Sequence, residues 1–223
     1  MGSLGILYIV ATPIGNLGDI TARALEVLKN VNFVLCEDTR VTKNLLTHFG
    51  ILTSTMSYHQ HSGEKKIAEI IKLLEEGKNL ALVTDAGTPG ISDPGNKLIA
   101  DLKISNAEFR VIPIPGPSAV ITALSVSGFP TDKFVFMGFP PHKNGRKKYF
   151  EEIATMKYTV ALYESCHRIK KTLTELGEVC TPDRKVCVCR ELTKKFETKY
   201  RGSITEVLDM DIKEKGEFVI IIY

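Results

Sequence analysis

The stretch LVTDAGTPGISDPGN (residues 82–96) decides how the chain around it folds and what it can bind. Its first residues are apolar and predict the end of a buried strand, and the Gly, Pro and Asp residues that follow predict a loop. A glycine-rich loop after a strand often binds phosphate through free backbone N–H groups. Here Pro89 and Pro94 have no N–H to donate. Asp85 and Asp93 would repel an anion, so the loop favours a neutral or cationic ligand.

Apolar runs of strand length recur on both sides of this stretch and alternate with helical patterns. The strands expected in the first half are ILYIV (6–10), NFVLC (32–36), LALV (80–83) and RVIPI (110–114). Apolar residues at helical spacing follow in ITARALEVLKN (20–30) and EKKIAEIIKLLEEG (64–77). Strands that are apolar on both faces and alternate with helices predict a parallel sheet covered on both sides.

The second half keeps the strands but loses the regular alternation. The strands expected there are KFVFMGF (133–139), TVALYE (159–164), KVCVCRE (185–191) and GEFVIIIY (216–223). CHRIKKTLTELG (166–177) predicts a helix with Ser165 as its N-cap. The PIPGPSA turn separates the halves. We therefore expect two α/β domains with a cleft between them, an N-terminal parallel domain (1–116) and a C-terminal mixed-sheet domain (117–223).

The composition is that of a globular protein, with 43% hydrophobic and 25% charged residues and a net charge of +3. This charge permits a nucleic-acid partner but is too small to indicate one. No run approaches the roughly 18–20 apolar residues of a membrane span, and the N-terminal segment lacks the pattern of a secretory signal. The five cysteines, an odd number, indicate reduced thiols in a cytoplasmic protein.

The C-x-C pair Cys187 and Cys189 lies in a strand pattern, where alternation places both side chains on one face. No second Cys/His pair at zinc spacing accompanies it. We interpret both thiols as small buried side chains rather than metal ligands or a redox pair. The same argument applies to the H-x-H of His59 and His61, which has no third ligand at usable spacing, so we expect no metal.

Acidic residues follow several of the expected strands. Because the carboxyl ends of parallel strands collect at one edge of a sheet, these residues should lie together there. The residues are Glu37, Asp38, Asp85, Asp93, Glu164 and Glu191. Singly, such an acid is more often a helix cap or a solvated loop residue, as Asp38 illustrates before a helix. As a set, they indicate a site for a hydroxylated or positively charged ligand.

Six motifs in this order resemble the tetrapyrrole methylase superfamily of S-adenosyl-L-methionine (AdoMet)-dependent methyltransferases. They are VATPIGNLGD, CEDTR, TDAGTPGISDPG, PGPSA, YESCHR and RELTKKFE. Within the superfamily they are similar to the branch that methylates a cytidine ribose 2′-oxygen of small-subunit ribosomal RNA. The resemblance implies two α/β domains, AdoMet in the cleft between them, and a homodimer. AdoMet carries a sulfonium and an ammonium but no phosphate, which suits the acidic loop, and the dinucleotide fingerprint G-x-G-x-x-G is absent.

The resemblance also implies which residues contact AdoMet. Some form the floor of its site, some form the loop around its methionine and ribose, and others belong to the second domain. These are Pro13, Gly15, Asp85, Ala86, Gly87, Thr88, Pro89, Ile91, Ser118, Ala119, Leu162, Tyr163, Glu164, Arg190, Glu191, Leu192, Thr193, Gly216, Glu217 and Phe218. For each glycine alone, ordinary turn chemistry is the alternative explanation.

The reaction implied is in-line transfer of a methyl group to a ribose 2′-oxygen. A neutral hydroxyl is a poor nucleophile, so a base or an orienting contact is expected. The catalytic candidates are Asp38, Asp85 and Glu164, followed by His167. The sequence leaves open which of these carboxylates acts.

RNA contacts are expected from basic and aromatic loops. Arg40 and Arg168 are suited to gripping phosphates. PPHKNGRKKYF (140–150) reads as a mobile basic loop that reaches the RNA backbone, with a solvated helix start as the alternative. In that loop, the side chains proposed to contact RNA are Lys143, Arg146, Lys147 and Lys148. A second loop carries Tyr58, His59 and His61, which would stack on a base or hydrogen-bond to it.

Two other functions remain open from the residues: a tetrapyrrole C-methyltransferase with a macrocyclic substrate, and a non-catalytic RNA-binding assembly protein. The EDTR and RELTK motifs favour the RNA branch, and the intact acidic Gly/Pro loops favour an enzyme over a binder. Members of the family often continue past the strand that ends this sequence. If such a segment helps to hold the RNA, we expect this chain to bind AdoMet but to methylate poorly.

Overall fold

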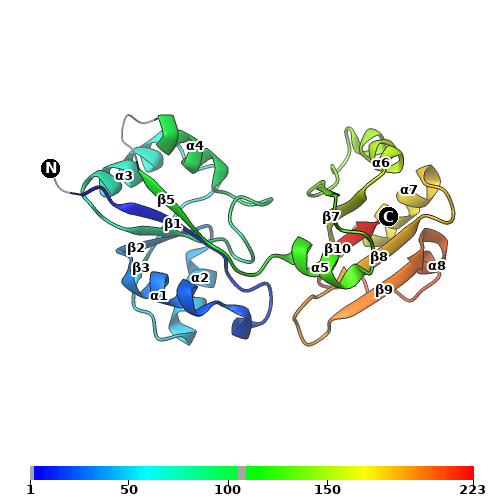
Figure 1. Ribbon diagram of the computed structural model, residues 1–223, viewed down its shortest axis with the longest axis horizontal. Coiled ribbons are helices and arrows are strands. Elements are labelled where there is room, and N and C mark those ends of the chain that lie inside the picture. Colours follow the sequence, from blue (N-terminus) through cyan, green and yellow to red (C-terminus); the bar gives the residue numbers. More distant parts are fainter. Residues whose placement is uncertain (1–2, 105–108) are drawn as a thin grey trace. The chain divides into compact units, whose positions relative to one another are not determined.

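The chain divides into two compact units, Met1–Ser118 and Ala119–Tyr223, each with its own sheet and core (Figure 1). The computed structural model describes residues 3–104 and 109–223. The sequence placed the domain boundary after residue 116, in the same PIPGPSA turn in which the two units meet along the chain.

The first unit is built on a sheet of five parallel strands in the order β3-β2-β4-β1-β5. Its elements are β1 (Ile6–Val10), the 3₁₀ turn η1 (Leu17–Asp19), α1 (Ala22–Asn30), β2 (Phe33–Cys36), α2 (Thr39–His48), β3 (Ser54–Ser57), α3 (Glu64–Glu75), β4 (Leu80–Leu82), α4 (Asn96–Ile104) and β5 (Arg110–Ile114). The four strands predicted here are confirmed. The short edge strand β3 was missed because STMS is polar and gives no apolar signal.

Helices cover both faces of this sheet, as the alternating pattern predicted. α1 and α2 pack on one face, where Leu28 and Leu46 meet Val34 and Ala81. α3 and α4 lie on the opposite face in Figure 1, in a second apolar layer built on Leu7, Leu35, Leu80 and Leu82. Successive residues of a strand point to opposite faces, so one buried strand supplies both layers. The predicted parallel sheet is therefore confirmed.

The second unit has a mixed sheet in the order β6-β7-β10-β8-β9, in which only the β6–β7 pair is parallel. Its elements are α5 (Ala119–Ser127), β6 (Phe134–Phe136), α6 (Arg146–Thr155), β7 (Thr159–Ser165), α7 (Ile169–Val179), β8 (Lys185–Arg190), β9 (Thr198–Ser203), α8 (Ile204–Leu208) and β10 (Glu217–Ile222). The predicted mixed sheet is confirmed, and part of the predicted basic loop is the first turn of α6.

One face of the second sheet carries α6, α7 and α8, and α5 packs on β7 and β10. Phe150, Leu173 and Ile204 anchor the three helices in the larger core. The expectation that Ser165 caps α7 was wrong: the residue before this helix is Arg168, and its side chain makes no capping bond. Within the described part of the chain, no helix is both long and apolar enough to span a bilayer.

Cys187 and Cys189 are confirmed as buried small side chains. Both have no solvent exposure, and their Sγ atoms lie 3.8 Å apart on one face of β8. All five cysteines are free thiols. Among the described residues, no group of three His, Cys, Asp or Glu side chains is arranged to hold a metal ion.

Candidate active site at the carboxyl edge of the first sheet

The loops that follow β1, β4 and β5 are tied together into one platform. Thr12 and Gly87 exchange two backbone hydrogen bonds of 2.9 and 3.0 Å, which join the first and third loops of the motif series. The Thr12 hydroxyl donates to the Thr84 carbonyl at 2.9 Å. The Thr88 hydroxyl donates to the Pro117 carbonyl at 3.1 Å. The quoted stretch therefore forms a fixed edge of the sheet, because its backbone is bonded to the loop after β1 and its Thr88 side chain to the loop after β5.

Glycine is required in this platform where the backbone turns. Gly87 and Gly90 have φ angles of 85° and 82°, in the left-handed region that side chains disfavour. A Cβ on Gly90 would lie 2.7 Å from the Asn96 side-chain oxygen, and Asn96 in turn donates to the Gly90 carbonyl at 2.9 Å. At both positions, glycine allows the backbone to turn where a side chain would be strained.

A pocket of about 280 Å³ opens at this edge, between the loop after β1, helix α2 and the loop after β4. Its walls combine aliphatic side chains with hydroxyl and amide groups, and its only carboxylate is Asp85. The lining residues are Thr12, Pro13, Leu17, Val41, Thr42, Asn44, Leu45, Thr84 and Asp85. The sequence singled out Pro13 and Asp85. The α2 residues were missed because their helical spacing is that of any amphipathic helix.

Four of the six acidic residues expected at this edge, Glu37, Asp38, Asp85 and Asp93, lie near one another there, whereas Glu164 and Glu191 belong to the second unit. Asp85 accepts a long hydrogen bond of 3.4 Å from the Asp38 backbone N–H. Burial raises the pKa of Asp93 to about 6, against the opposing effect of the Thr84 hydroxyl. The negative charges of Glu37 and Asp85 add to the rise. Carboxylates brought this close favour a cation among them, because a positive charge relieves their mutual repulsion.

Asp38 is bound to its own helix. Its carboxylate accepts the Arg40 backbone N–H at 2.8 Å, which caps α2, and it pairs with the Arg40 guanidinium at 2.7 Å. The bonds from Arg40 hold the pKa of Asp38 at about 2. So acidic a carboxyl is a weak base, and the geometry supports the capping role rather than the predicted catalytic one. Arg40 is exposed, but its charge is paired with this cap.

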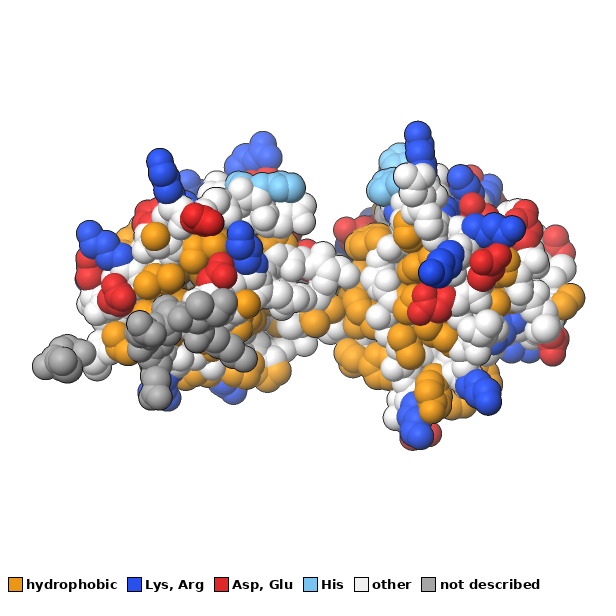
Figure 2. All heavy atoms as spheres, turned by 90° about the horizontal axis from the view of Figure 1, so that it is seen from above, with side chains coloured by type: hydrophobic (Ala, Val, Ile, Leu, Met, Phe, Trp, Pro, Cys, Tyr) orange, Lys and Arg blue, Asp and Glu red, His pale blue; other side chains and the backbone are white. Residues whose placement is uncertain are grey.

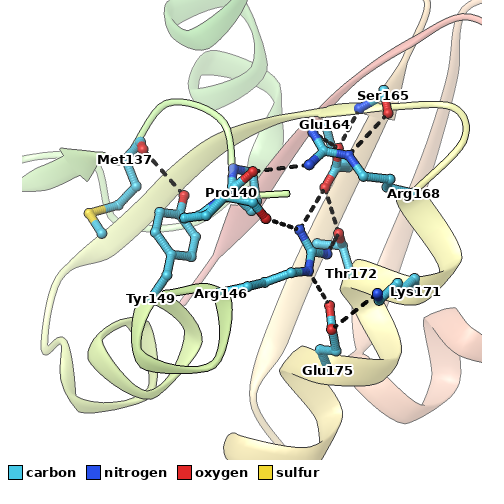
Figure 3. Close-up of polar contacts among 11 residues, drawn as sticks. Met137, Pro140, Arg146, Tyr149, Glu164, Ser165, Arg168, Lys171, Thr172 and Glu175 are labelled. Atoms are coloured by element: carbon cyan, nitrogen blue, oxygen red, sulfur yellow. Dashed lines mark hydrogen bonds and ion pairs between the residues drawn. The ribbon is translucent and has the colours of Figure 1, made fainter. Parts of the chain in front are cut away.

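Glu164 lies in a different environment from the one its predicted catalytic role requires. Its side chain has no solvent exposure and is paired with Arg168 at 2.9 Å and with Arg146 at 3.8 Å (Figure 3). The Thr172 hydroxyl donates to it at 2.6 Å, and the Ser165 backbone N–H at 2.7 Å. This corrects the prediction, because a carboxylate enclosed by protein donors has no room for a ribose hydroxyl. His167 is exposed on the short segment that follows.

Two of the side chains predicted to contact RNA are buried, and this too is a correction. Arg146 is 4% exposed, and its guanidinium is used by Glu175, Thr172 and the Pro141 carbonyl. Tyr58 is 3% exposed and packs in the core beneath α3 and α4. Neither can reach a phosphate or a base, since burial removes the surface that such a contact needs.

Other candidates for RNA contact are accessible. Lys143, Lys147 and Lys148 are exposed on and beside the start of α6. His61 is exposed, and its ring lies 6.3 Å from that of the half-buried His59. Figure 2 shows Lys, Arg and His side chains projecting together from one side of the second unit. Arg168 is half-buried and bonded to the Pro140 carbonyl at 3.1 Å, so it supports this region rather than contacting solvent freely.

The second-unit residues expected to contact the cofactor fall into two groups. Leu162 and Phe218 are core residues, while Tyr163 occupies the other face of β7, where it contacts Phe136 and Phe139. The second group is a loop closed by ion pairs, in which Lys194 joins Glu191 at 3.0 Å to Glu217 at 2.6 Å.

This loop has unusual backbone geometry. Glu191 and Thr193 have φ angles of 53° and 65°, which are rare for residues with a side chain, above all for a β-branched one. Arg190 supports the loop from below through the Lys215 and Phe196 carbonyls, at 2.6 and 3.0 Å. Local strain of this kind persists only where the surroundings hold it, and it is often found at functional sites.

Comparison with known proteins shows to which family this chain is similar. The family model for tetrapyrrole (corrin/porphyrin) methylases matches residues 6–208. Ribosomal RNA small subunit methyltransferase I of Synechocystis sp. is 47% identical over 222 residues, which cover 98% of this chain and 79% of that protein. The protein of the same name from Vibrio cholerae is 48% identical, over 98% of this chain and 77% of that protein.

Solved structures share the fold at lower identity. Cobalt precorrin-4 methyltransferase, a cobalamin biosynthetic enzyme, matches with a TM-score of 0.68 at 20% identity, over 96% of this chain and 93% of that one. Uroporphyrin-III-C-methyltransferase from Thermus thermophilus matches with a TM-score of 0.65 at 18% identity, over 97% of this chain and 94% of that one.

Proposed function

We propose, because the chain belongs to the tetrapyrrole (corrin/porphyrin) methylase family, that it methylates the 2′-oxygen of a cytidine ribose in small-subunit ribosomal RNA with AdoMet as methyl donor. The relatives that share almost half of its residues are named as ribosomal RNA methyltransferases. The tetrapyrrole enzymes share only its fold, at 18–20% identity. Neither a macrocycle methyltransferase nor a non-catalytic binder is favoured.

The observation that carries the proposal is the acidic platform at the edge of the first sheet. AdoMet is cationic at its sulfonium and its ammonium group, and Glu37, Asp85 and Asp93 bring negative charge to this edge. The loop offers no phosphate nest, because prolines interrupt its N–H groups. The residues therefore fit AdoMet. When bound, AdoMet supplies a methyl group activated by the sulfonium, and Asp85 to Pro89, with Ile91, would hold it.

Asp85 is the carboxylate best placed to act on the ribose hydroxyl. It lies in the wall of the pocket and is exposed, whereas Asp38 caps a helix and Glu164 is enclosed. Its role would be to accept the 2′-hydroxyl proton or to orient that oxygen for in-line attack. The hydroxyl and amide groups of Thr42 and Asn44 in the same pocket can hydrogen-bond a nucleoside.

RNA binding is assigned to the exposed lysines at the start of α6. Lys143, Lys147 and Lys148 stand within a short segment, so together they can neutralise neighbouring phosphates. Such contacts position the RNA and carry no sequence information. Selection of the cytidine belongs to the pocket of the first unit.

The direct test is methyl transfer from tritiated AdoMet to small ribosomal subunits that lack the modification, with AdoMet affinity measured by calorimetry. We expect label on RNA whose neighbouring phosphodiester resists alkaline cleavage, since a 2′-O-methyl group blocks the attack of that oxygen. Label on a base, or on a corrinoid precursor instead of RNA, contradicts the proposal.

The Asp85→Asn variant tests the catalytic assignment. We expect kcat to fall about 10²- to 10⁴-fold, the usual effect of a general base, with KM for the subunits little changed. Asp132→Asn, an exposed carboxylate of the second unit, is the matched control and should leave the rate unaltered. A loss of AdoMet affinity with kcat preserved would leave Asp85 as a cofactor ligand only and contradict its catalytic role.

The family resemblance also supports a homodimer in the cytoplasm, where ribosomal RNA is found. Large apolar side chains such as Ile121 and Phe139 are 53% and 51% exposed on the second unit and provide surface for association. Light scattering at micromolar protein concentration tests this assignment. A monomer mass at all concentrations contradicts it.

A further inference from the structure

A buried group of charged side chains holds the base of the lysine-bearing loop, residues 140–145 (Figure 3). The Arg146 guanidinium donates to the Pro141 carbonyl at 3.0 Å. The Arg168 guanidinium donates to the Pro140 carbonyl at 3.1 Å. Two arginines thus grip two successive carbonyls at the point where the loop leaves the sheet.

One buried carboxylate, Glu164, contacts both arginines. One oxygen of Glu164 meets Arg168 at 2.9 Å, and the other faces Arg146 at 3.8 Å. The Thr172 hydroxyl closes the gap, since it donates to Glu164 at 2.6 Å and accepts from Arg146 at 2.6 Å. Glu175 takes the remaining face of Arg146 at 2.7 Å. Charge-assisted bonds of this kind are short and directional, so they fix geometry as well as neutralise charge.

The group acts on both ends of the loop. Its start is held through the two proline carbonyls, and its end is Arg146 itself, the first residue of α6. Between them, the backbone passes through Gly145 at a φ of 80°, in the left-handed region. Lys143 lies within the segment so defined, and Lys147 and Lys148 follow directly, all three exposed.

We propose that Glu164, Arg146 and Arg168 are positioning residues for RNA binding, which hold the loop 140–145 in the shape that presents Lys143, Lys147 and Lys148 to the phosphates. This rests on the proposed function, in which these lysines contact ribosomal RNA. A buried ion pair is weak evidence for stability in itself, because desolvation offsets the attraction, whereas its directional bonds specify one arrangement. The group therefore holds a segment rich in proline and glycine in one conformation, and with it the positions of the lysine side chains.

The test compares RNA binding by the full chain with the clamp weakened and with the lysines neutralised. Glu164→Gln removes the shared charge at constant volume, and Thr172→Val removes the bridging hydroxyl without altering any charge. We expect each to weaken binding of unmodified small-subunit ribosomal RNA at least fivefold, with AdoMet affinity within twofold of wild type. Hydrogen exchange should rise in residues 140–148. The matched control is Glu214→Gln, at an exposed glutamate that pairs with Lys170. It should change neither RNA affinity nor hydrogen exchange.

A double-mutant cycle separates positioning from general stability. The triple variant Lys143→Gln/Lys147→Gln/Lys148→Gln should bind RNA more weakly and flatten its salt dependence, unlike the control Lys133→Gln/Lys157→Gln/Lys213→Gln. If the clamp acts through these lysines, adding Glu164→Gln or Thr172→Val to the first triple should cause little further loss. Losses that simply multiply overturn the proposal, as does unchanged RNA affinity in both clamp variants.

The outcomes also distinguish the two proposals. If the lysine triple binds RNA as well as wild type, the assignment of RNA contact to this loop fails, and the clamp proposal fails with it. If the triple loses affinity but a folded Thr172→Val variant does not, the RNA contact stands and the clamp role alone is wrong. Should Glu164→Gln not fold, Thr172→Val still decides, because it leaves every charge in place.

Discussion

Single side chains in this protein change role with their surroundings, and the carboxylates show it most clearly. Asp38 and Asp85 both follow strands of the first sheet. Asp38 is held by Arg40 and caps a helix, whereas Asp85 faces a pocket. Glu164 lies on strand β7 of the second sheet and is enclosed by two arginines. A carboxylate thus serves as a cap, a candidate base or part of a clamp, because neighbours decide which protonation state and which contacts are favoured.

Asp93 gives a pH dependence at this scale. Its pKa is about 6 in the folded chain, above the ordinary value of 3.8. A carboxyl whose pKa is raised by folding stabilises the fold at pH values below its pKa in the unfolded chain. This contribution is lost as the pH rises through its pKa in the folded chain. For Asp93 the window runs from about pH 4 to about 6.

The measurement is urea unfolding of wild type and Asp93→Asn between pH 4 and 7. The asparagine imitates the protonated form, so wild type should lose about 1 kcal/mol relative to the variant as the pH rises, a figure reduced for the half of the side chain that water screens. A stability difference that does not change with pH would show that Asp93 titrates normally in the folded chain.

At the scale of elements, the loops at strand ends are held by specific backbone conformations. The loop after β8 is the strongest case, because Glu191 and Thr193 adopt φ angles of 53° and 65°. Gly216, which lies against this loop, has a φ angle of 93°. A Cβ on Gly216 would lie 2.4 Å from the Glu191 side chain. That side chain has little freedom to move, since Lys194 and the Glu217 backbone N–H both bind it at 3.0 Å.

Gly216→Ala should therefore destabilise the second unit by about 1–3 kcal/mol, from strain in the left-handed region and from the clash. Denaturant unfolding measures the loss. Gly63→Ala is the matched control, because Gly63 has an ordinary φ of −73° and open space around it; since Gly63 is the N-cap of α3, where Ala is less favoured than Gly, a loss below about 1 kcal/mol is expected there. Equal effects at the two glycines would contradict this explanation.

At the scale of the whole molecule, the chain is two units with separate cores. Leu28 anchors α1 in the first unit, and Ile153 anchors α6 in the second, and neither is exposed to solvent. Each unit closes its own sheet with its own helices, so each has the contacts of an independent folding unit.

Leu28→Ala and Ile153→Ala should each cost about 2–5 kcal/mol, and each loss should be confined to the unit that contains the cavity. Hydrogen exchange followed by mass spectrometry reports both units in one experiment. We expect faster exchange through residues 6–114 for the first variant and through 119–222 for the second. Accelerated exchange in both units from either variant would show that they unfold as one body.

The sequence by itself determined the fold class, the apolar strands and the ordered motifs, but not the polar edge strands β3 and β9. Strand runs such as ILYIV and the helical spacing of EKKIAEIIKLLEEG are local patterns, and apolar periodicity records burial directly. The motif order likewise needed no structure to indicate the family. Asp85 was identified as a candidate site residue in this way, because it lies in the loop after a strand and the residue types of that loop argue against a phosphate site.

The tertiary structure alone decided which polar side chains are accessible. Arg146 read as one more charge in a basic run, but its partner Glu175 lies 29 residues away. Tyr58 read as an exposed stacking residue, yet it fills the core of the first unit. Burial and pairing of a polar group depend on contacts between elements that the chain brings together from distant positions. A local pattern carries no record of such contacts, so the roles of Glu164, Arg146 and Tyr58 appear only once the sheets and helices are packed.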